Sequence, residues 1–238
     1  MFLKEFAKGL INTLIPKVCL LCGKRLKSKK FLCEKCQDFE RNISPFCSKC
    51  GIGISPDSKT KLCQRCRSKK FYFIKNLSPF IFKEPLSKLI HLFKYKSFRF
   101  LGDFFSEKLI EFIQNLHIPL EDYHFISSVP LHKRKLRERE FNQSKLLAKN
   151  ISNHFGIPYK EVLGVKQYLD SQVNKTAKKR TIDIRGNFYI IGEVKDKNII
   201  LIDDVFTTGA TLSECAKTLK EKGTKKVLTI TLAIKRIN

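Results

Sequence analysis

The sequence predicts an α/β protein in which a twisted parallel sheet, flanked by helices, follows a small N-terminal domain rich in paired cysteines. Two stretches of the 238-residue chain support this prediction. In the first, an apolar run at residues 199–202 leads directly into two acids and a threonine-rich turn. A short continuous apolar run is typical of a strand buried on both faces of a parallel sheet. In the second, eight of the nine cysteines form four CxxC pairs between residues 19 and 66.

The turn after the apolar run is the first candidate site. Asp203 and Asp204 end the run, and a turn of small or hydroxyl-bearing residues follows: Thr207, Thr208, Gly209, Ala210 and Thr211. Ligands of parallel sheets bind beyond the carboxyl ends of the strands, and the start of the next helix is a ready anion site. Two carboxylates beside a phosphate cradle suit a ligand with vicinal hydroxyls and a phosphate, which describes a phosphorylated ribose.

Two other interpretations of this turn are weaker. A buried strand that ends in an ordinary aspartate-capped turn needs neither the second acid nor the TTGAT spacing. A Walker phosphate loop requires the pattern GxxxxGK[ST], which the chain lacks.

The paired cysteines predict two structural zinc sites. One CxxC knuckle supplies two sulfur ligands, and two knuckles complete a tetrahedral Cys₄ site. A disulfide framework would require an oxidising compartment, and residues 1–16 lack the apolar core of a signal peptide. Thioredoxin-like chemistry would leave three pairs unexplained. The expected zinc ligands are therefore Cys19, Cys22, Cys33, Cys36, Cys47, Cys50, Cys63 and Cys66.

The spacing leaves two ways to pair the knuckles. Sequential ligation joins the first pair to the second and the third to the fourth, whereas a cross-braced arrangement joins the first to the third. Shorter intervening loops lose less entropy on closure, which favours the sequential arrangement.

The charge of the chain predicts polyanionic partners. The formal net charge is +25 at pH 7, and two Zn(Cys)₄ centres would lower it to roughly +21. Such an excess attracts nucleic acid, phosphorylated substrates or anionic membranes. No apolar stretch is long enough to span a membrane.

Basic residues cluster twice, at residues 133–139 and at residues 175–180. The first cluster follows a short strand that Pro130 ends, and a helix is expected after it, from about Asn142 to Phe155. The second lies in a polar stretch without periodicity and is expected to be a loop. Either cluster suits bidentate phosphate contacts, and either is also compatible with plain solvated surface.

Two motifs resemble known families. The segment at residues 199–211 resembles the phosphoribosyl pyrophosphate (PRPP) signature of the type I phosphoribosyltransferases. VPLHKRKLREREFNQS, residues 129–144, resembles the VPLHxxRxxxRGFNQ motif of the ComF family, bacterial phosphoribosyltransferase-like proteins tied to natural competence. ComF proteins also commonly begin with an amphipathic helix and a zinc ribbon. The resemblance implies an amphipathic helix at residues 1–16, a double zinc ribbon at 17–70 and a phosphoribosyltransferase domain at 76–238.

The resemblance also implies roles for single residues. Asp203 and Asp204 are the implied catalytic pair that holds the ribose hydroxyls, and the turn at residues 207–211 wraps the 5′-phosphate of Mg²⁺-bound PRPP. A pyrophosphate loop is implied at Pro130, Leu131 and His132, with Arg134, Arg137 and Arg139 beside it. Lys94, Gln172 and Arg180 match further family segments, whereas Glu140 and Asp183 stand where the family has glycine and asparagine.

The function implied is that of a PRPP-binding phosphoribosyltransferase, a pentosyl glycosyltransferase, that supports uptake of single-stranded DNA in natural competence. Its implied partners are PRPP, single-stranded DNA and a competence helicase or other DNA-uptake proteins. Its implied location is the cytoplasm, including the inner face of the membrane. Two alternatives stay open. One is a DNA-handling zinc-ribbon module that keeps the PRPP site as a sensor or relic, and the other is a nucleotide-salvage enzyme unrelated to competence.

The remaining periodicity predicts a strand at residues 77–82, helices at 86–96 and 101–116, and a closing core strand at 225–235. Cys215 lies within the helix expected after the turn, and we expect it to be a buried small apolar residue.

Overall fold

The computed structural model describes residues 18–27, 30–167 and 184–236. The expected N-terminal helix at residues 1–16 lies outside this part of the chain. So do the second basic cluster and the family positions Gln172, Arg180 and Asp183.

The centre of the molecule is a parallel sheet. Its strands are β1 (Lys75–Leu77), β2 (Phe80–Ile81), β3 (Phe125–Ser128), β6 (Asn198–Phe206) and β7 (Lys226–Ile234). The order is β1-β7-β6-β3, and β2 continues beside β7 after β1. Every pairing in this sheet is parallel, as the buried apolar run predicts.

The strand expected at residues 77–82 is divided in two. Ser78 and Pro79 separate β1 from β2, although both pieces pair with β7. Proline has no N–H to donate to a neighbouring strand, so the pairing with β7 is interrupted there. The Pro79 carbonyl accepts a hydrogen bond from the Asn42 N–H at 2.8 Å.

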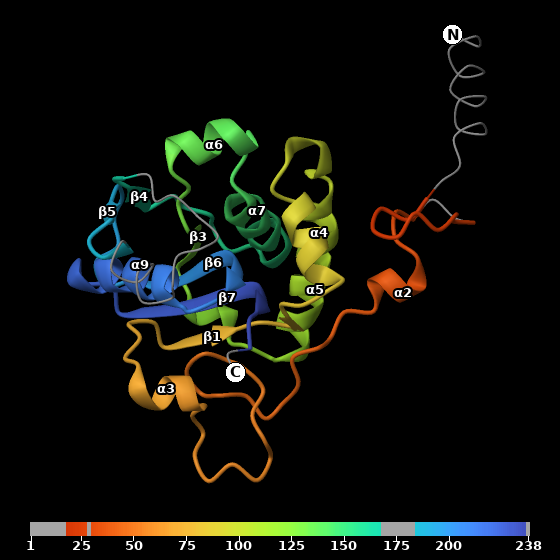
Figure 1. Cartoon of the computed structure of the whole chain (residues 1–238). Helices are drawn as coiled ribbons and strands as arrows, with labels where there is room; N and C mark the ends of the chain where they lie inside the picture. Colours follow the sequence, from red (N-terminus) through yellow and green to blue (C-terminus); the bar gives the residue numbers. More distant parts are fainter. Residues whose placement is uncertain (1–17, 28–29, 168–183, 237–238) are drawn as a thin grey trace.

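Helices cover both faces of the sheet (Figure 1). One face is covered by α4 (Leu86–Leu92), α5 (Leu101–Asn115) and α7 (Gln143–Phe155), and the other by α9 (Ala210–Glu221). Along β6 the apolar side chains alternate between two cores: Ile200 and Ile202 pack in the core of α4, α5 and α7, whereas Ile199 and Leu201 pack in the core of α9. All four residues are at most 1% exposed. The two-sided burial explains why this strand is an unbroken apolar run.

Three elements differ from the sequence-based predictions. The helix expected at residues 86–96 ends at Leu92, where i→i+3 hydrogen bonds tighten its last turn, and a 3₁₀ turn follows at Lys96–Phe98. The first basic cluster, whose arginines the resemblance implies to lie with the pyrophosphate loop, forms helix α6 (Lys133–Arg139). An antiparallel pair, β4 (Leu163–Val165) with β5 (Phe188–Ile190), was not predicted. A second 3₁₀ turn, Leu120–Asp122, precedes β3.

The cysteine-rich segment forms two lobes, which carry the short helices α2 (Glu34–Gln37) and α3 (Gln64–Ser68). Figure 1 shows the first lobe at the side of the molecule and the second beneath β1. Phe31 of the first lobe packs edge-on against Phe100 and Phe104, at centroid distances of 5.3 and 5.1 Å. The second lobe packs in the same core as α9. The two lobes therefore contact different faces of the sheet.

Helix α6 ends in a strained conformation. Its C-terminal cap, Glu140, has a φ of 63°, and its N–H donates to the Leu136 carbonyl at 2.7 Å. This left-handed region favours glycine, because a Cβ crowds the following carbonyl there. The conformation explains why the ComF motif has glycine where this chain has Glu140.

We expect Glu140→Gly to stabilise the fold by about 1 kcal/mol, because glycine removes the left-handed strain. For a chain of this size the melting temperature should rise by about 2–4 °C. Glu138→Gly, in the interior of the same helix, is the matched control and should instead destabilise the fold by about 1 kcal/mol. Calorimetry of both variants checks the prediction, and a fall in melting temperature for Glu140→Gly would contradict it.

Candidate functional site

The acid pair lies at the carboxyl end of β6 and is held by side chains from two helical segments. Ser144, near the start of α7, donates its hydroxyl to Asp203 Oδ1 at 2.8 Å. The Asp204 N–H donates to the same oxygen at 2.9 Å. Lys94, which follows α4, places its Nζ 3.8 Å from Asp204 Oδ2. These contacts orient both carboxylates.

Asp203 is a perturbed acid. Burial, together with the neighbouring charge of Asp204, raises its pKa to about 7, and the hydrogen bond from Ser144 opposes this shift. A carboxyl group whose charge is disfavoured by its surroundings is typical of a functional site.

The turn after β6 forms a cradle at the start of α9. Gly209 has a φ of 76°, and a Cβ at this position would lie 2.4 Å from Cζ of Phe206. Only glycine fits such a site. The Thr208 hydroxyl accepts the Ala210 N–H at 3.3 Å, and α9 begins at Ala210. The N–H groups of a helix start and the hydroxyls of Thr207 and Thr211 are suited to a phosphate.

The segment expected to bind pyrophosphate leaves the sheet beside the acid pair. In the parallel pairing of β3 with β6, Ser128 is the partner of Ile202, and the Val129 N–H donates to the Ile202 carbonyl at 3.0 Å. Pro130 and Leu131 follow immediately. The segment therefore starts at the same sheet edge as Asp203, although it continues as helix α6.

His132 and Asn142 shape this segment. His132 Nδ1 accepts the Arg134 N–H at 3.1 Å and so caps α6. Asn142 caps α7 through its Oδ1, and its Nδ2 donates to the Val129 carbonyl at 3.0 Å. Both residues therefore have a structural role: His132 caps α6, and Asn142 joins the start of α7 to the residue that follows β3.

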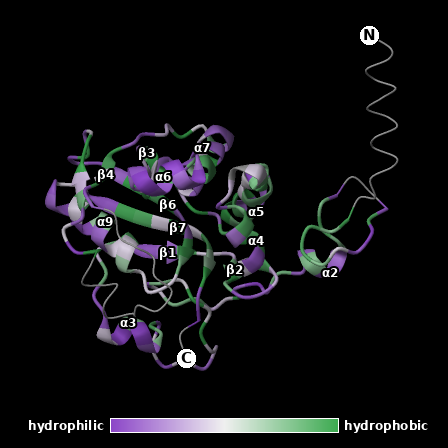
Figure 2. Cartoon of the chain, turned by 45° about the horizontal axis from the view of Figure 1, so that its top comes forward, coloured by the Kyte–Doolittle hydropathy of each residue, from purple (hydrophilic) through white to green (hydrophobic). Residues whose placement is uncertain are grey.

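The arginines of α6 differ in exposure, since Arg134 and Arg137 are exposed whereas Arg139 is half-buried. Arg134 pairs with Glu138 at 3.3 Å, Arg139 donates to the Gln143 Oε1 at 3.2 Å, and Arg137 is exposed. Figure 2 shows α6 as largely hydrophilic. A cavity of about 440 Å³ adjoins the segment, with Lys133, Lys145, Lys149 and Tyr189 in its wall.

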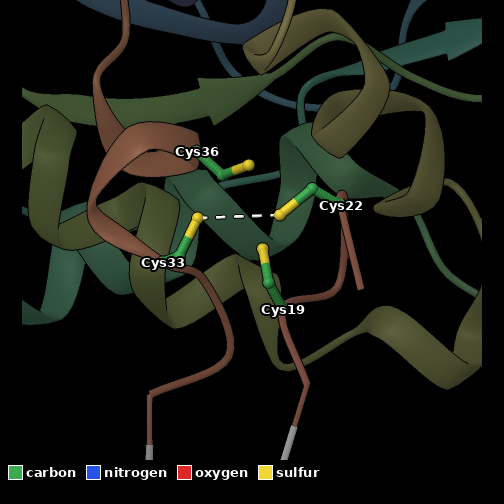
Figure 3. Close-up of side chains that lie close together, drawn as sticks. All are labelled: Cys19, Cys22, Cys33 and Cys36. Atoms are coloured by element: carbon green, nitrogen blue, oxygen red, sulfur yellow. Dashed lines mark hydrogen bonds between the residues drawn. The ribbon is translucent and has the colours of Figure 1, made fainter. Parts of the chain in front are cut away.

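The eight paired cysteines form two tetrads. The sulfurs of Cys19, Cys22, Cys33 and Cys36 all lie within 4.8 Å of one another, and so do those of Cys47, Cys50, Cys63 and Cys66. Figure 3 shows the first four side chains converging, with Cys22 Sγ and Cys33 Sγ 3.7 Å apart. A tetrahedral zinc ion with Zn–S bonds of about 2.3 Å separates its sulfurs by about 3.8 Å. The residues therefore fit two structural zinc sites, paired sequentially and not cross-braced.

Two contacts of the site are not predicted by the sequence. Ser144 belongs to the FNQS motif, but nothing in the motif indicates its bond to Asp203. Arg65 donates its guanidinium to the Thr207 carbonyl, and its place between the ligands Cys63 and Cys66 gives no signal of contact with the turn. The buried position expected for Cys215 is confirmed, since this residue is fully buried.

Comparison with known proteins agrees with this architecture. The phosphoribosyl transferase domain family matches residues 142–238, and the double zinc ribbon domain family matches residues 10–67. The competence protein ComFC of Bacillus subtilis is 26% identical over 223 residues, which cover 87% of this chain and 90% of that protein. The resemblance to the ComF family is confirmed.

Another relative is the DNA utilization protein YhgH of Escherichia coli K12. It is 28% identical over 222 residues, which cover 90% of this chain and 95% of the relative. Among solved structures, a purine phosphoribosyltransferase from Pyrococcus horikoshii is 23% identical and covers 56% of this chain and 71% of its own, with a TM-score of 0.34, too low to support an argument. In the part of the chain that the structure describes, no helix is both long and apolar enough to cross a membrane.

We expect Asp203→Asn to change how stability depends on pH. The folded-state pKa of Asp203 is raised above its unfolded value of 3.8, so this group favours folding at low pH, and that contribution is lost as the pH rises through about 7. The asparagine variant cannot ionise and should not show this loss. Relative to wild type it should gain about 4 kcal/mol between pH 4 and pH 8, since the pKa is raised by roughly three units and each unit corresponds to about 1.4 kcal/mol.

Denaturant titrations at the two pH values provide the measurement. Asp57→Asn, in an exposed turn, controls for the loss of one negative charge. Parallel pH profiles for wild type and Asp203→Asn would show that burial does not disfavour the charge of this carboxyl group.

Proposed function

We propose that this chain binds PRPP with Mg²⁺ and acts as a phosphoribosyltransferase. The observation that supports this proposal is the juxtaposition of the acid pair with the glycine turn at the start of α9. Asp203 and Asp204 supply charged acceptors for two vicinal hydroxyls, and the turn at residues 207–211 supplies donors for a phosphate. Both lie within the region that matches the phosphoribosyl transferase domain.

The protein would contribute positioning and electrostatics to the transfer. The carboxylates would hold the ribose, and the cradle would hold its 5′-phosphate. The pyrophosphate would lie toward Pro130–His132, because this segment starts at the same edge of the sheet. The Mg²⁺ that accompanies PRPP would neutralise pyrophosphate charge as the leaving group departs. Hydrogen bonds from Ser144 and the ion pair of Lys94 would keep the acids in place throughout.

A role in handling single-stranded DNA is the second function proposed. The relatives named for competence and DNA utilization favour it, and so do the net charge of +25 and the exposed Arg134 and Arg137 of α6. Exposed arginines can contact successive phosphates of a strand. Such a protein would work beside a competence helicase or other DNA-uptake proteins at the inner face of the membrane.

We expect Asp203→Asn combined with Asp204→Asn to weaken the binding of Mg²⁺-PRPP by at least about 100-fold, because two charge-assisted hydrogen bonds are removed. Isothermal titration calorimetry measures the affinity, and circular dichroism verifies that the variant is folded. Asp57→Asn serves as the control. Equal affinity of wild type and the double variant would refute the assignment of the acid pair.

For DNA, we expect Arg134→Gln, Arg137→Gln and Arg139→Gln together to reduce the salt dependence of single-stranded DNA binding. The logarithmic slope should fall by roughly two units, at about 0.7 for each phosphate that the protein no longer neutralises. If α6 instead binds pyrophosphate, the same triple variant loses PRPP affinity and keeps its DNA slope.

The control variant removes three charges near the amino end of β7, opposite to the strand ends that carry the site. Its substitutions are Lys222→Gln, Lys225→Gln and Lys226→Gln. A triple variant of α6 that matches wild type in both measurements would mean that this helix serves neither ligand.

A further inference from the structure

The second cysteine lobe contacts the phosphate turn directly through Arg65. This residue lies in α3, between the tetrad members Cys63 and Cys66. Its Nη1 donates to the Thr207 carbonyl at 2.6 Å and its Nη2 to the Lys235 carbonyl at 3.2 Å. Its guanidinium also lies 5.3 Å from the centroid of the Phe206 ring. One side chain of the lobe thus joins the ends of β6 and β7.

The direction of the Thr207 carbonyl matters for the cradle. In a planar trans peptide the C=O of one residue and the N–H of the next point in opposite directions. Because Arg65 holds the Thr207 carbonyl toward the lobe, the Thr208 N–H points away from it, into the turn. A charged donor makes this bond stronger than a neutral one would. Arg65 thereby fixes the orientation of an amide in the proposed phosphate site.

Aromatic side chains support the same turn from beneath. A Cβ on Gly209 would lie 2.4 Å from the Phe206 ring and 2.8 Å from the Phe71 ring, so the backbone of the turn rests on both. Phe71 stacks on the buried Phe73 at 5.0 Å. The Tyr72 N–H, in the same segment, is 3.3 Å from the Ser213 hydroxyl in the first turn of α9.

The first cysteine lobe makes no comparable contribution among the described residues. Its packing partners Phe100 and Phe104 belong to the core on the other face of the sheet. Two tetrads with the same ligands therefore have different neighbours. One stabilises the start of α5, and the other lies against the phosphate turn.

We propose that Arg65 is a positioning residue: the second Cys₄ lobe, through Arg65, sets the geometry of the turn at residues 207–211 and so its affinity for a sugar 5-phosphate. The affinity part of this proposal rests on the proposed function, whereas the geometric part does not depend on any ligand.

The test compares Arg65→Gln and Arg65→Lys with Arg67→Gln in the full-length chain. Arg67 lies in the same helix, but its bonds to the Leu62 carbonyl and the Thr60 hydroxyl stay within the lobe. Hydrogen exchange of the peptide over residues 206–213 reports on the turn without a ligand. Calorimetry with ribose 5-phosphate and, separately, with pyrophosphate reports on binding, and metal analysis verifies the zinc content.

We expect faster exchange at residues 206–213 in Arg65→Gln, with zinc retained, and about tenfold weaker binding of ribose 5-phosphate. Pyrophosphate affinity should not change, because that group is expected at Pro130–His132. Arg65→Lys keeps the charge but has no fork to join two carbonyls, so its values should fall in between. Arg67→Gln should match wild type.

A second pair of variants separates the two lobes. Cys66→Ser removes a ligand of the second tetrad, and Cys36→Ser removes one of the first. We expect faster exchange of the turn only in Cys66→Ser. Equal exchange of the turn in Arg65→Gln, Arg67→Gln and wild type, or equal acceleration by both cysteine variants, would overturn the proposal. Failure of wild type to bind ribose 5-phosphate would refute the proposed function alone, since the exchange rates would still decide the role of Arg65.

Discussion

The parallel pairing of β6 with β3 on one side and β7 on the other is the constraint on which the rest of the structure depends. Parallel strands end at the same edge of a sheet, so this pairing brings together groups that lie far apart in the chain. It places the acid pair, the turn at residues 207–211 and the start of the 129–142 segment beside one another. The burial of Ile199–Ile202 on both faces maintains the register, because a shift by one residue would exchange the two cores.

The acid pair lowers the stability of the folded state at neutral pH. Asp203 and Asp204 are adjacent acids at a partly buried strand end, and the pKa of Asp203 is raised to about 7 by burial and by its neighbour. Ser144 and Lys94 compensate only part of this, through one hydrogen bond and one ion pair of 3.8 Å. This uncompensated charge is consistent with the proposed ligand, which would bring hydroxyl groups and a cation to the acid pair.

The two zinc-ribbon lobes show how a small metal-stabilised module can do more than stabilise itself. A lobe of this size buries too little apolar surface to fold without its metal. Once folded, it presents rigid side chains to its neighbours. Asn42 between the lobes donates to the carbonyls of Gly51 and Ser78, at 2.7 and 2.9 Å, and so ties the second lobe to the segment between β1 and β2. Arg65 extends the same attachment to the end of β6.

The sequence by itself determined those features that depend on residues close together in the chain. The CxxC spacing indicated the metal sites, the apolar run before two acids indicated the buried strand, and Asn142 and Phe155 marked the ends of α7. Helix α6 was missed because KRKLRER has no apolar periodicity, and its ends depend on the His132 cap and on the left-handed Glu140. The strands β4 and β5, three residues each, are too short for a pattern.

Only the tertiary structure decided which tetrads form and which side chains hold the site. The Ser144–Asp203 bond spans 59 residues and the Arg65–Thr207 bond spans 142. Contacts at such separations depend on how the sheet and helices pack, since no local propensity or spacing encodes them. The sequence thus determined the chemistry of the site, and the packing of the second lobe and α7 against the sheet determined its geometry.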